Sequence, residues 1–139
     1  MFRKILVPVD FTPKNERALR QARELAEISH GEILLVHVVE TLEDELDDDL
    51  RGFYAKLEAK AEGRMRPLVE KLGDGSFSAR STIVLGHRAR AIVECAGRER
   101  AEVVVLSSHR VDPDRPGADW MTISYKVAIL ARCPVLLVK

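Results

Sequence analysis

Residues 5–12 read Ile-Leu-Val-Pro-Val-Asp-Phe-Thr, an apolar run that ends in an acidic residue and a short polar turn. The run is continuous rather than alternating, which is typical of a strand buried on both faces of a parallel sheet. Thr12 and Pro13 then predict a helix start, because threonine caps helix N-termini and proline fits the first helical turn. Apolar residues recur at helical spacing as far as His30.

The same alternation of strand and helix continues to the end of the chain. Continuous apolar runs at 33–39 and 103–106 predict buried strands, and the partly alternating run 77–85 predicts a strand nearer the sheet edge. Residues 134–138 form a fifth strand. Helical periodicity fills the intervals, over 46–72 with a kink or interruption at Pro67, over 87–100, and from Trp120 or Met121 to Arg132. This order predicts a doubly wound, mostly parallel α/β sheet with two helices on each face.

Length and composition limit the classes of function. The 139 residues suit one domain, 1–139. Lys plus Arg and Asp plus Glu both number 22, so the basic excess that is typical of nucleic-acid binding is missing. The first apolar run is too short for a signal peptide, and no stretch reaches transmembrane length. We therefore expect a cytoplasmic protein that contacts neither nucleic acid nor membrane.

Several conspicuous residues have ordinary structural explanations. Cys95 and Cys133 lie in apolar, periodic stretches and are expected in the core rather than in a disulfide or a metal pair. The acids between Glu40 and Asp49 lack the Asp-Gly framework of a calcium loop and suit a solvated loop before a helix N-terminus. The histidines have no metal-ligand spacing, and His37 is expected to be a satisfied buried histidine. No metal site is predicted.

The residues that follow the strands are the first place to look for a binding site. Ligands of open α/β sheets bind outside the carboxyl ends of the strands, where strand order reverses. Asp10 follows the first strand. With Thr12 as the helix cap, the Asp10 carboxylate would be available to a ligand hydroxyl or amine. An equally good interpretation is that Asp10 only shapes the turn.

Five segments, in order along nearly the whole chain, resemble one known family. Residues 5–12 look like the signature of the universal stress proteins, and 34–38 resembles their second strand. Residues 83–91 resemble the third strand and the helix after it, while 103–109 and 133–138 resemble the last two strands. The resemblance implies a Rossmann-like sheet with strand order 3-2-1-4-5 and its switch point between strands one and four.

The resemblance is incomplete at the loop after the fourth strand. Many universal stress proteins bind ATP there through a G-x-x-G, spacer, G-[ST] loop, in which glycine lets the backbone approach the phosphates. This chain has Ser107, Arg110 and Met121 in place of the glycines, and it keeps only Thr122. The sequence thus implies the family's fold without its phosphate loop.

The candidate nucleotide or anion site combines strand ends with this loop. Asp10, Val38 and Thr122 match the family's adenosine-side and hydroxyl positions, and Arg110 could meet a phosphate by charge. The sequence does not establish a cofactor, and ATP and AMP are both candidate ligands of this site. The full set is Pro8, Val9, Asp10, Val38, Ser107, His109, Arg110, Thr122, Ile123 and Ser124.

The sequence supports two functions above others. The first is a non-enzymatic stress-response or regulatory protein that acts as a dimer, with weak or absent ATP binding. The second is an adenine-nucleotide-binding module with slow hydrolysis, in which Arg110, Arg115 and the helix N-terminus near Thr122 replace the glycines. A small hydrolase or transferase would need a nucleophile with a base, and neither a G-x-S-x-G motif nor a partner for Ser107 and Ser108 is evident. No catalytic residue is predicted.

The last strand predicts how the protein associates. The predicted strand, 134–138, reaches almost to the last residue of the sequence, so we expect no tail to cover its apolar edge. Uncovered edge strands tend to pair with other strands. A two-fold axis lets one strand pair with its own copy, and the resemblance implies the same interface. We therefore expect a homodimer, and further protein partners, with the contact made by Pro134, Val135, Leu136, Leu137 and Val138.

Overall fold

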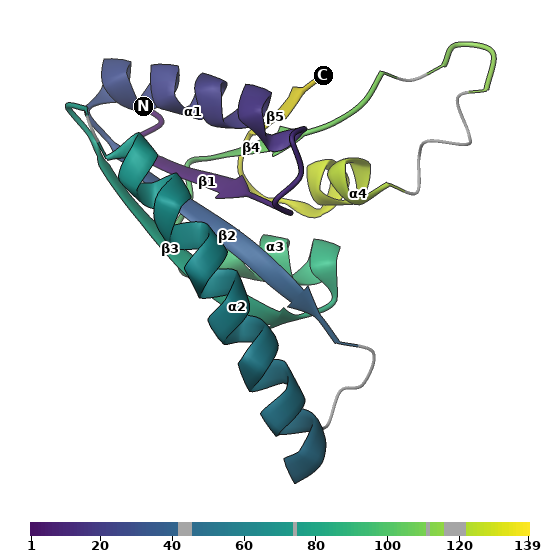
Figure 1. The fold of residues 1–139 in the computed structure, drawn as a ribbon. Coiled ribbons are helices and arrows are strands. Elements are labelled where there is room, and N and C mark those ends of the chain that lie inside the picture. Colours follow the sequence, from purple (N-terminus) through teal and green to yellow (C-terminus); the bar gives the residue numbers. More distant parts are fainter. Residues whose placement is uncertain (42–45, 74, 111, 116–121) are drawn as a thin grey trace.

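The computed structural model describes residues 1–41, 46–73, 75–110, 112–115 and 122–139. Strands and helices alternate along the chain, as Figure 1 shows. The elements are β1 (Lys4–Pro8), α1 (Asn15–Ser29), β2 (Glu32–Glu40), α2 (Asp48–Leu72), β3 (Ser78–Gly86), α3 (Arg88–Arg98), β4 (Val103–Ser107), α4 (Ile123–Leu130) and β5 (Val135–Val138).

The strands form one parallel sheet in the order β3-β2-β1-β4-β5. The sheet confirms the expected strand order and the edge position of β3, and β4 lies inside it. Ile5 of β1 is paired with Ile33 of β2 on one side and with Val103 of β4 on the other. Strand order reverses between β1 and β4, so the loops that follow these two strands diverge from a common point.

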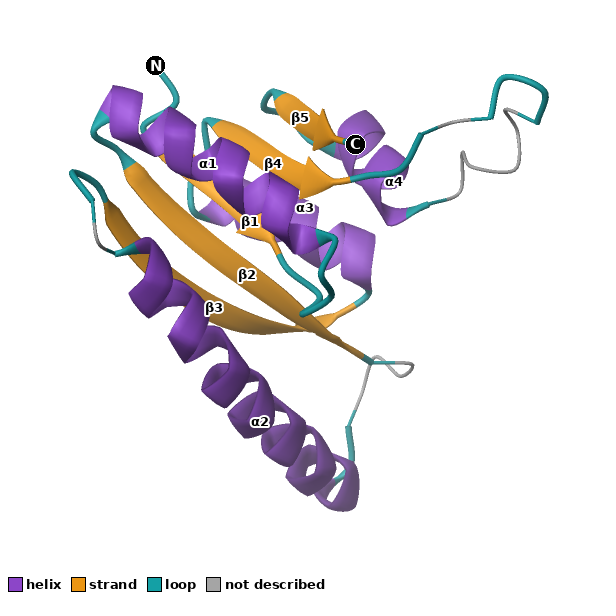
Figure 2. Cartoon of the chain, turned by 45° about the horizontal axis from the view of Figure 1, so that its top comes forward, coloured by secondary structure: helices purple, strands orange, loops and turns teal. Residues whose placement is uncertain are grey.

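Helices cover both faces of the sheet, as Figure 2 shows. Ile5 and Val7 pack into a cluster with residues of α1 and α2, whereas Leu6 packs with residues of α3 and α4 on the opposite face. Successive side chains of a strand point to opposite faces, so a strand covered on both sides needs a continuous apolar run. Cys95 is fully buried in the second cluster, which confirms its core assignment.

Helix α1 starts later than the sequence predicts. Its N-cap is Lys14, and neither Thr12 nor Pro13 belongs to the helix. The hydroxyl of Thr12 donates instead to Asp10 Oδ1 at 2.7 Å, and its carbonyl accepts from the amide of Asn15. A nearby carboxylate thus competes with the helix end for the threonine side chain, which is why the predicted cap is wrong.

Helix α2 runs through Pro67, so the predicted interruption is wrong. Both Pro67 and Gly63, whose carbonyl loses its helical partner, are exposed, so water can hydrate that carbonyl. Met65 and Leu68 pack on the core at either side of the proline and keep the helix on the sheet. The half of α2 that precedes Ala61 extends past the sheet (Figure 1), and Phe53 there is exposed.

Two other expectations concern helix boundaries. Asp47 caps α2 by accepting from the amide of Leu50 at 2.9 Å, as expected for acids before a helix, while residues 42–45 lie outside the described residues. The predicted start of the last helix at Trp120 or Met121 also lies outside them. Of the helices in the described ranges, none is long and apolar enough to cross a membrane.

The tight turn from α1 into β2 provides a test of the fold. A Cβ on Gly31 would lie 2.7 Å from the Cα of Arg3, where neighbouring backbone cannot move without disturbing the first β1–β2 hydrogen bond. We expect Gly31→Ala to lower the free energy of unfolding by at least about 2 kcal/mol. Gly63→Ala is the matched control, because it meets open space on α2 and should stabilise by up to about 1 kcal/mol. Urea unfolding measures both, and equal effects would contradict this packing.

Candidate functional site

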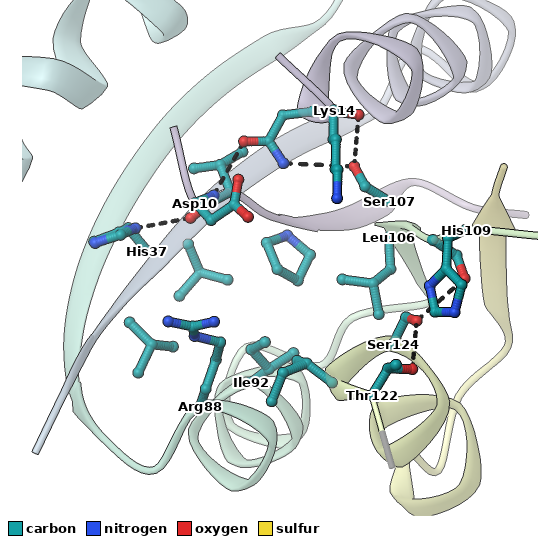
Figure 3. A pocket seen from close by; sticks show the side chains of 17 residues that line it. Asp10, Lys14, His37, Arg88, Ile92, Leu106, Ser107, His109, Thr122 and Ser124 are labelled. Atoms are coloured by element: carbon teal, nitrogen blue, oxygen red, sulfur yellow. Dashed lines mark hydrogen bonds between the residues drawn. The ribbon is translucent and has the colours of Figure 1, made fainter. Parts of the chain in front are cut away.

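A cavity of about 220 Å³ opens at the carboxyl ends of β1 and β4. It lies where strand order reverses, between the loops after β1 and β4 and the first turns of α3 and α4 (Figure 3). Its apolar lining consists of Pro8, Val9, Val36, Val38, Ile92, Leu106 and Ile123. Its polar lining consists of Asp10, Lys14, Asn15, His37, Arg88, Ser107, Ser108, His109, Thr122 and Ser124.

Asp10 shapes the turn that leaves β1. Its Oδ1 accepts hydrogen bonds from the amide of Thr12 at 3.0 Å and from the hydroxyl at 2.7 Å. The turn places Phe11 at φ 64°, a left-handed conformation that is uncommon for a residue with a β-carbon. The predicted Thr12 cap implied that the whole Asp10 carboxylate is available to a ligand. Its Oδ1 is instead occupied by both of these hydrogen bonds. Within the described residues, Oδ2 has no hydrogen-bond partner.

These bonds set the charge state of Asp10. Partial burial acts to raise the pKa of the carboxyl, but the hydrogen bonds from the Thr12 side chain and backbone outweigh it. The pKa of Asp10 therefore lies below its ordinary value of 3.8, and the side chain is anionic near neutral pH.

Asn15 joins the loop after β1 to the end of β4. Its Oδ1 accepts from the amide of Asp10 at 3.0 Å, and its Nδ2 donates to Ser107 Oγ at 3.4 Å. The Ser107 hydroxyl in turn donates to the carbonyl of Lys14 at 3.0 Å. Asn15 is buried, so this polar bridge is held away from solvent and fixes the spacing of the two loops.

His37 forms the wall of the cavity on the β2 side. Its Nδ1 lies 2.8 Å from the carbonyl of Val9, and a carbonyl only accepts, so Nδ1 carries the hydrogen. The centroid of the His37 ring lies 4.3 Å from the centroid of the Phe11 ring. The Arg64 guanidinium lies 4.5 Å from the centroid of the Phe11 ring. A stack of side chains from α2, the turn and β2 thus supports the strained Phe11 backbone.

Hydroxyl groups cluster on the α4 side. Ser124 Oγ lies 3.1 Å from Ser108 Oγ and 3.3 Å from Thr122 Oγ1, within hydrogen-bond distance of both. The Tyr125 hydroxyl donates to the carbonyl of His109 at 3.3 Å, which ties the loop after β4 to α4. The cluster gives this end of the cavity several donors without a formal charge.

Two cationic side chains line the cavity from opposite sides (Figure 3). Arg88 Nη2 lies 3.5 Å from Glu40 Oε2, a long and solvent-exposed ion pair. Lys14 forms no ion pair with the described residues. In the parts of the chain that the structure describes, no three His, Cys, Asp or Glu side chains form a cluster that could hold a metal ion.

Comparison with known proteins assigns the chain to a family. The sequence profile of the universal stress proteins matches residues 1–139. This chain belongs to the universal stress protein family. A universal stress protein of Methanocaldococcus jannaschii is 26% identical over 129 residues, 78% of each chain, and one from Thermus aquaticus is 28% identical over 141 residues, 100% of each.

Solved structures of universal stress proteins have the same fold. The structure of the M. jannaschii protein gives a TM-score of 0.81 at 26% identity, covering 100% of this chain and 96% of that one. An Archaeoglobus fulgidus universal stress protein solved in complex with dAMP gives 0.63 at 22% identity, covering 100% of both chains. A universal stress protein solved in complex with cAMP gives a TM-score of 0.64 at 18% identity, covering 100% of this chain and 99% of that one.

The structure places the residues expected from the universal stress protein pattern around one cavity. Pro8, Val9, Asp10, Val38, Ser107, His109, Thr122, Ile123 and Ser124 all line it. Arg110 is exposed and does not, and Met121 lies outside the described residues. The cavity is also lined by residues that were not predicted from the sequence: Lys14, Asn15, Val36, His37, Arg88, Ile92, Leu106 and Ser108. Sequence adjacency could have indicated His37, Leu106 and Ser108, because each directly adjoins a residue of the predicted set.

Acid should remove the stabilisation that the Asp10 turn provides. A lowered folded-state pKa means that the carboxylate stabilises the folded state fully above about pH 3.8, and that this contribution is lost as the pH falls through the lower folded value. The difference in unfolding free energy between wild type and Asp10→Asn should therefore be constant near neutral pH and shrink as the pH is lowered below the ordinary value of 3.8 in urea unfolding. Glu24→Gln, an exposed change on α1, serves as the control. A pH-independent difference for Asp10→Asn would contradict the turn's role.

Proposed function

We propose that this chain is a non-enzymatic, cytoplasmic universal stress protein that binds an adenine nucleotide in the cavity at β1 and β4, with only weak affinity for ATP. The observation that carries the proposal is the pairing of an anionic Asp10 with apolar surface in one cavity at the switch point of the sheet. The dAMP and cAMP complexes of two distant relatives agree with this class of ligand.

The cavity offers separate environments for a base and a sugar. Val38, Ile92 and Leu106 supply apolar surface for the faces of a purine ring. Asp10 Oδ2 has spare capacity to accept hydrogen bonds, which suits a ribose hydroxyl or an exocyclic amine. An apolar pocket with a few convergent polar groups is the usual form of a small-molecule site.

The weak affinity for ATP follows from the loop after β4. A backbone cradle for several phosphates needs residues that adopt positive φ and leave room for close approach, which glycine does best. Ser107 and Arg110 carry β-carbons at two of these positions, and Met121 stands at the third in the sequence. Pro113 also removes a backbone donor from this loop.

The serines at the end of β4 support the non-enzymatic assignment. A nucleophilic serine needs its proton taken by a base. The Ser107 hydroxyl donates to the carbonyl of Lys14, and Ser108 Oγ pairs with the hydroxyl of Ser124. Neither of these partners is basic, so neither can take the proton of the serine hydroxyl that it contacts.

Titration calorimetry with AMP and ATP tests the ligand. Wild type should bind AMP, Asp10→Ala should weaken that binding about tenfold or more, and ATP should bind no more tightly than AMP. Glu24→Ala, which removes an exposed carboxylate outside the cavity, should leave AMP binding unchanged. Micromolar or tighter ATP binding that disappears in Asp10→Ala would show that this loop cradles polyphosphate despite its side chains.

We propose further that the protein is a homodimer through Pro134–Val138. β5 is an edge strand made of apolar residues, and Leu136 is 39% exposed on it. Exposed Ile129 and Leu130 on α4 extend the apolar surface beside it. The opposite edge strand, β3, carries Arg80 in ion pairs, and charges on an edge discourage pairing.

Sedimentation at micromolar concentration tests this interface. Leu136→Lys should convert a dimer into a monomer, because it places a charge in the apolar strand pair. Leu85→Lys is the matched control, since Leu85 is also 39% exposed but lies on β3, and this variant should remain dimeric. A monomeric wild type, or a dimer disrupted by Leu85→Lys alone, would refute the assignment of the interface to β5.

A further inference from the structure

The charges around the cavity are arranged asymmetrically. Within the described residues, the cavity is lined by one negatively charged side chain, Asp10, and by two positively charged ones, Lys14 and Arg88. Arg88 is partly neutralised by Glu40 at 3.5 Å. The ammonium of Lys14 has no acidic partner within the described residues, and in Figure 3 its side chain reaches into the cavity. The uncompensated positive charge of the cavity is therefore at Lys14.

The backbone of Lys14 is held firmly, whereas its side chain is exposed. Its carbonyl accepts from Ser107 Oγ at 3.0 Å, which fastens it to the end of β4. The next residue, the buried Asn15, bonds both Asp10 and Ser107. The base of the Lys14 side chain is thus fixed between the two loops, and its position does not depend on the loop that carries Arg110.

Neutral donors lie on another side of the same cavity. Ser108, Thr122 and Ser124 point their hydroxyls at one another with separations of 3.1 and 3.3 Å, and a hydroxyl can rotate to donate to a ligand. Figure 3 shows Lys14 on one side of the cavity and Thr122 and Ser124 on the other, with Leu106 drawn between them. One ammonium and several hydroxyls suit a single tetrahedral anion, because both donate and neither repels it.

Asp10 determines the orientation of a nucleotide in the cavity. A carboxylate attracts hydroxyl and amine hydrogens and repels a phosphate, so a ribose or base edge belongs beside it. The phosphate then belongs beyond it, towards Lys14 and the hydroxyl cluster. The apolar residues Val38 and Ile92 line the part of the cavity left for the base.

We infer that Lys14, with the hydroxyls of Ser108, Thr122 and Ser124, forms a side-chain phosphate site that takes the place of the glycine loop and selects nucleoside monophosphates. This inference rests on the proposed function and specifies its ligand. A single lysine neutralises one phosphate, and further phosphates would have to be held by the loop in which the glycines are replaced. Monophosphates are therefore preferred over both the uncharged nucleoside and the triphosphate.

Calorimetry with AMP and adenosine on the full chain tests the assignment. Wild type should bind AMP about tenfold more tightly than adenosine, since a charge-assisted contact exceeds a neutral one by about that factor. Lys14→Met should abolish the preference for AMP while adenosine affinity stays unchanged, and added salt should reduce the preference in wild type. Lys60→Met makes the same change on exposed α2, outside the cavity, and should bind like wild type.

The outcomes separate the two proposals. If wild type binds neither adenosine nor AMP, the proposed function itself is wrong. If wild type binds both equally, or if Lys14→Met keeps the preference for AMP, the adenosine site stands and the phosphate assignment is wrong. Ser124→Ala gives a second readout, since it should reduce AMP affinity more than adenosine affinity. Circular dichroism and a thermal melt confirm that each variant is folded, which is expected for Lys14→Met because this side chain is exposed.

Discussion

The buried amide of Asn15 holds the two halves of the cavity together. The loops after β1 and β4 leave the sheet in different directions, and the hydrogen bonds of Asn15 to Asp10 and Ser107 fix their separation. A buried amide left without one partner costs more than its hydrogen bond contributed, so the bridge is stable only when both loops are in place. The positions of Asp10, Lys14 and Ser107 all follow from it.

The turn after β1 shows how a site can depend on strain that is supported elsewhere. Phe11 adopts a left-handed backbone conformation that costs about 1 kcal/mol or more for a residue with a β-carbon. Its ring contacts both the ring of His37 and the guanidinium of Arg64, so β2 and α2 both contribute to the turn. His37 in turn donates to the carbonyl of Val9 at the end of β1. The cavity wall is therefore supported from both neighbouring elements.

The sequence could predict the fold because each buried strand needs apolar side chains on both faces, and Ile5, Leu6 and Val7 show this directly. It could not predict the start of α1, because that depends on whether Asp10 or the helix end captures the Thr12 hydroxyl. Lys14 and Arg88 were missed for a different reason. They are ordinary surface residues in the sequence, and only the meeting of helix ends at the switch point brings them to one cavity.

A phosphate site made from side chains behaves differently from one made from backbone amides. Backbone donors are fixed by the fold, whereas a bound lysine gives up side-chain entropy of about 1.5–2 kcal/mol, and its exposed charge is screened by salt. Such a site binds its ligand more weakly and releases it more readily. Because Asn15 and Ser107 fix the base of Lys14, the lost freedom is confined to one side chain, and the scaffold need not rearrange. Under the proposed assignment of Lys14, the site would exchange a small nucleotide readily rather than retain it tightly.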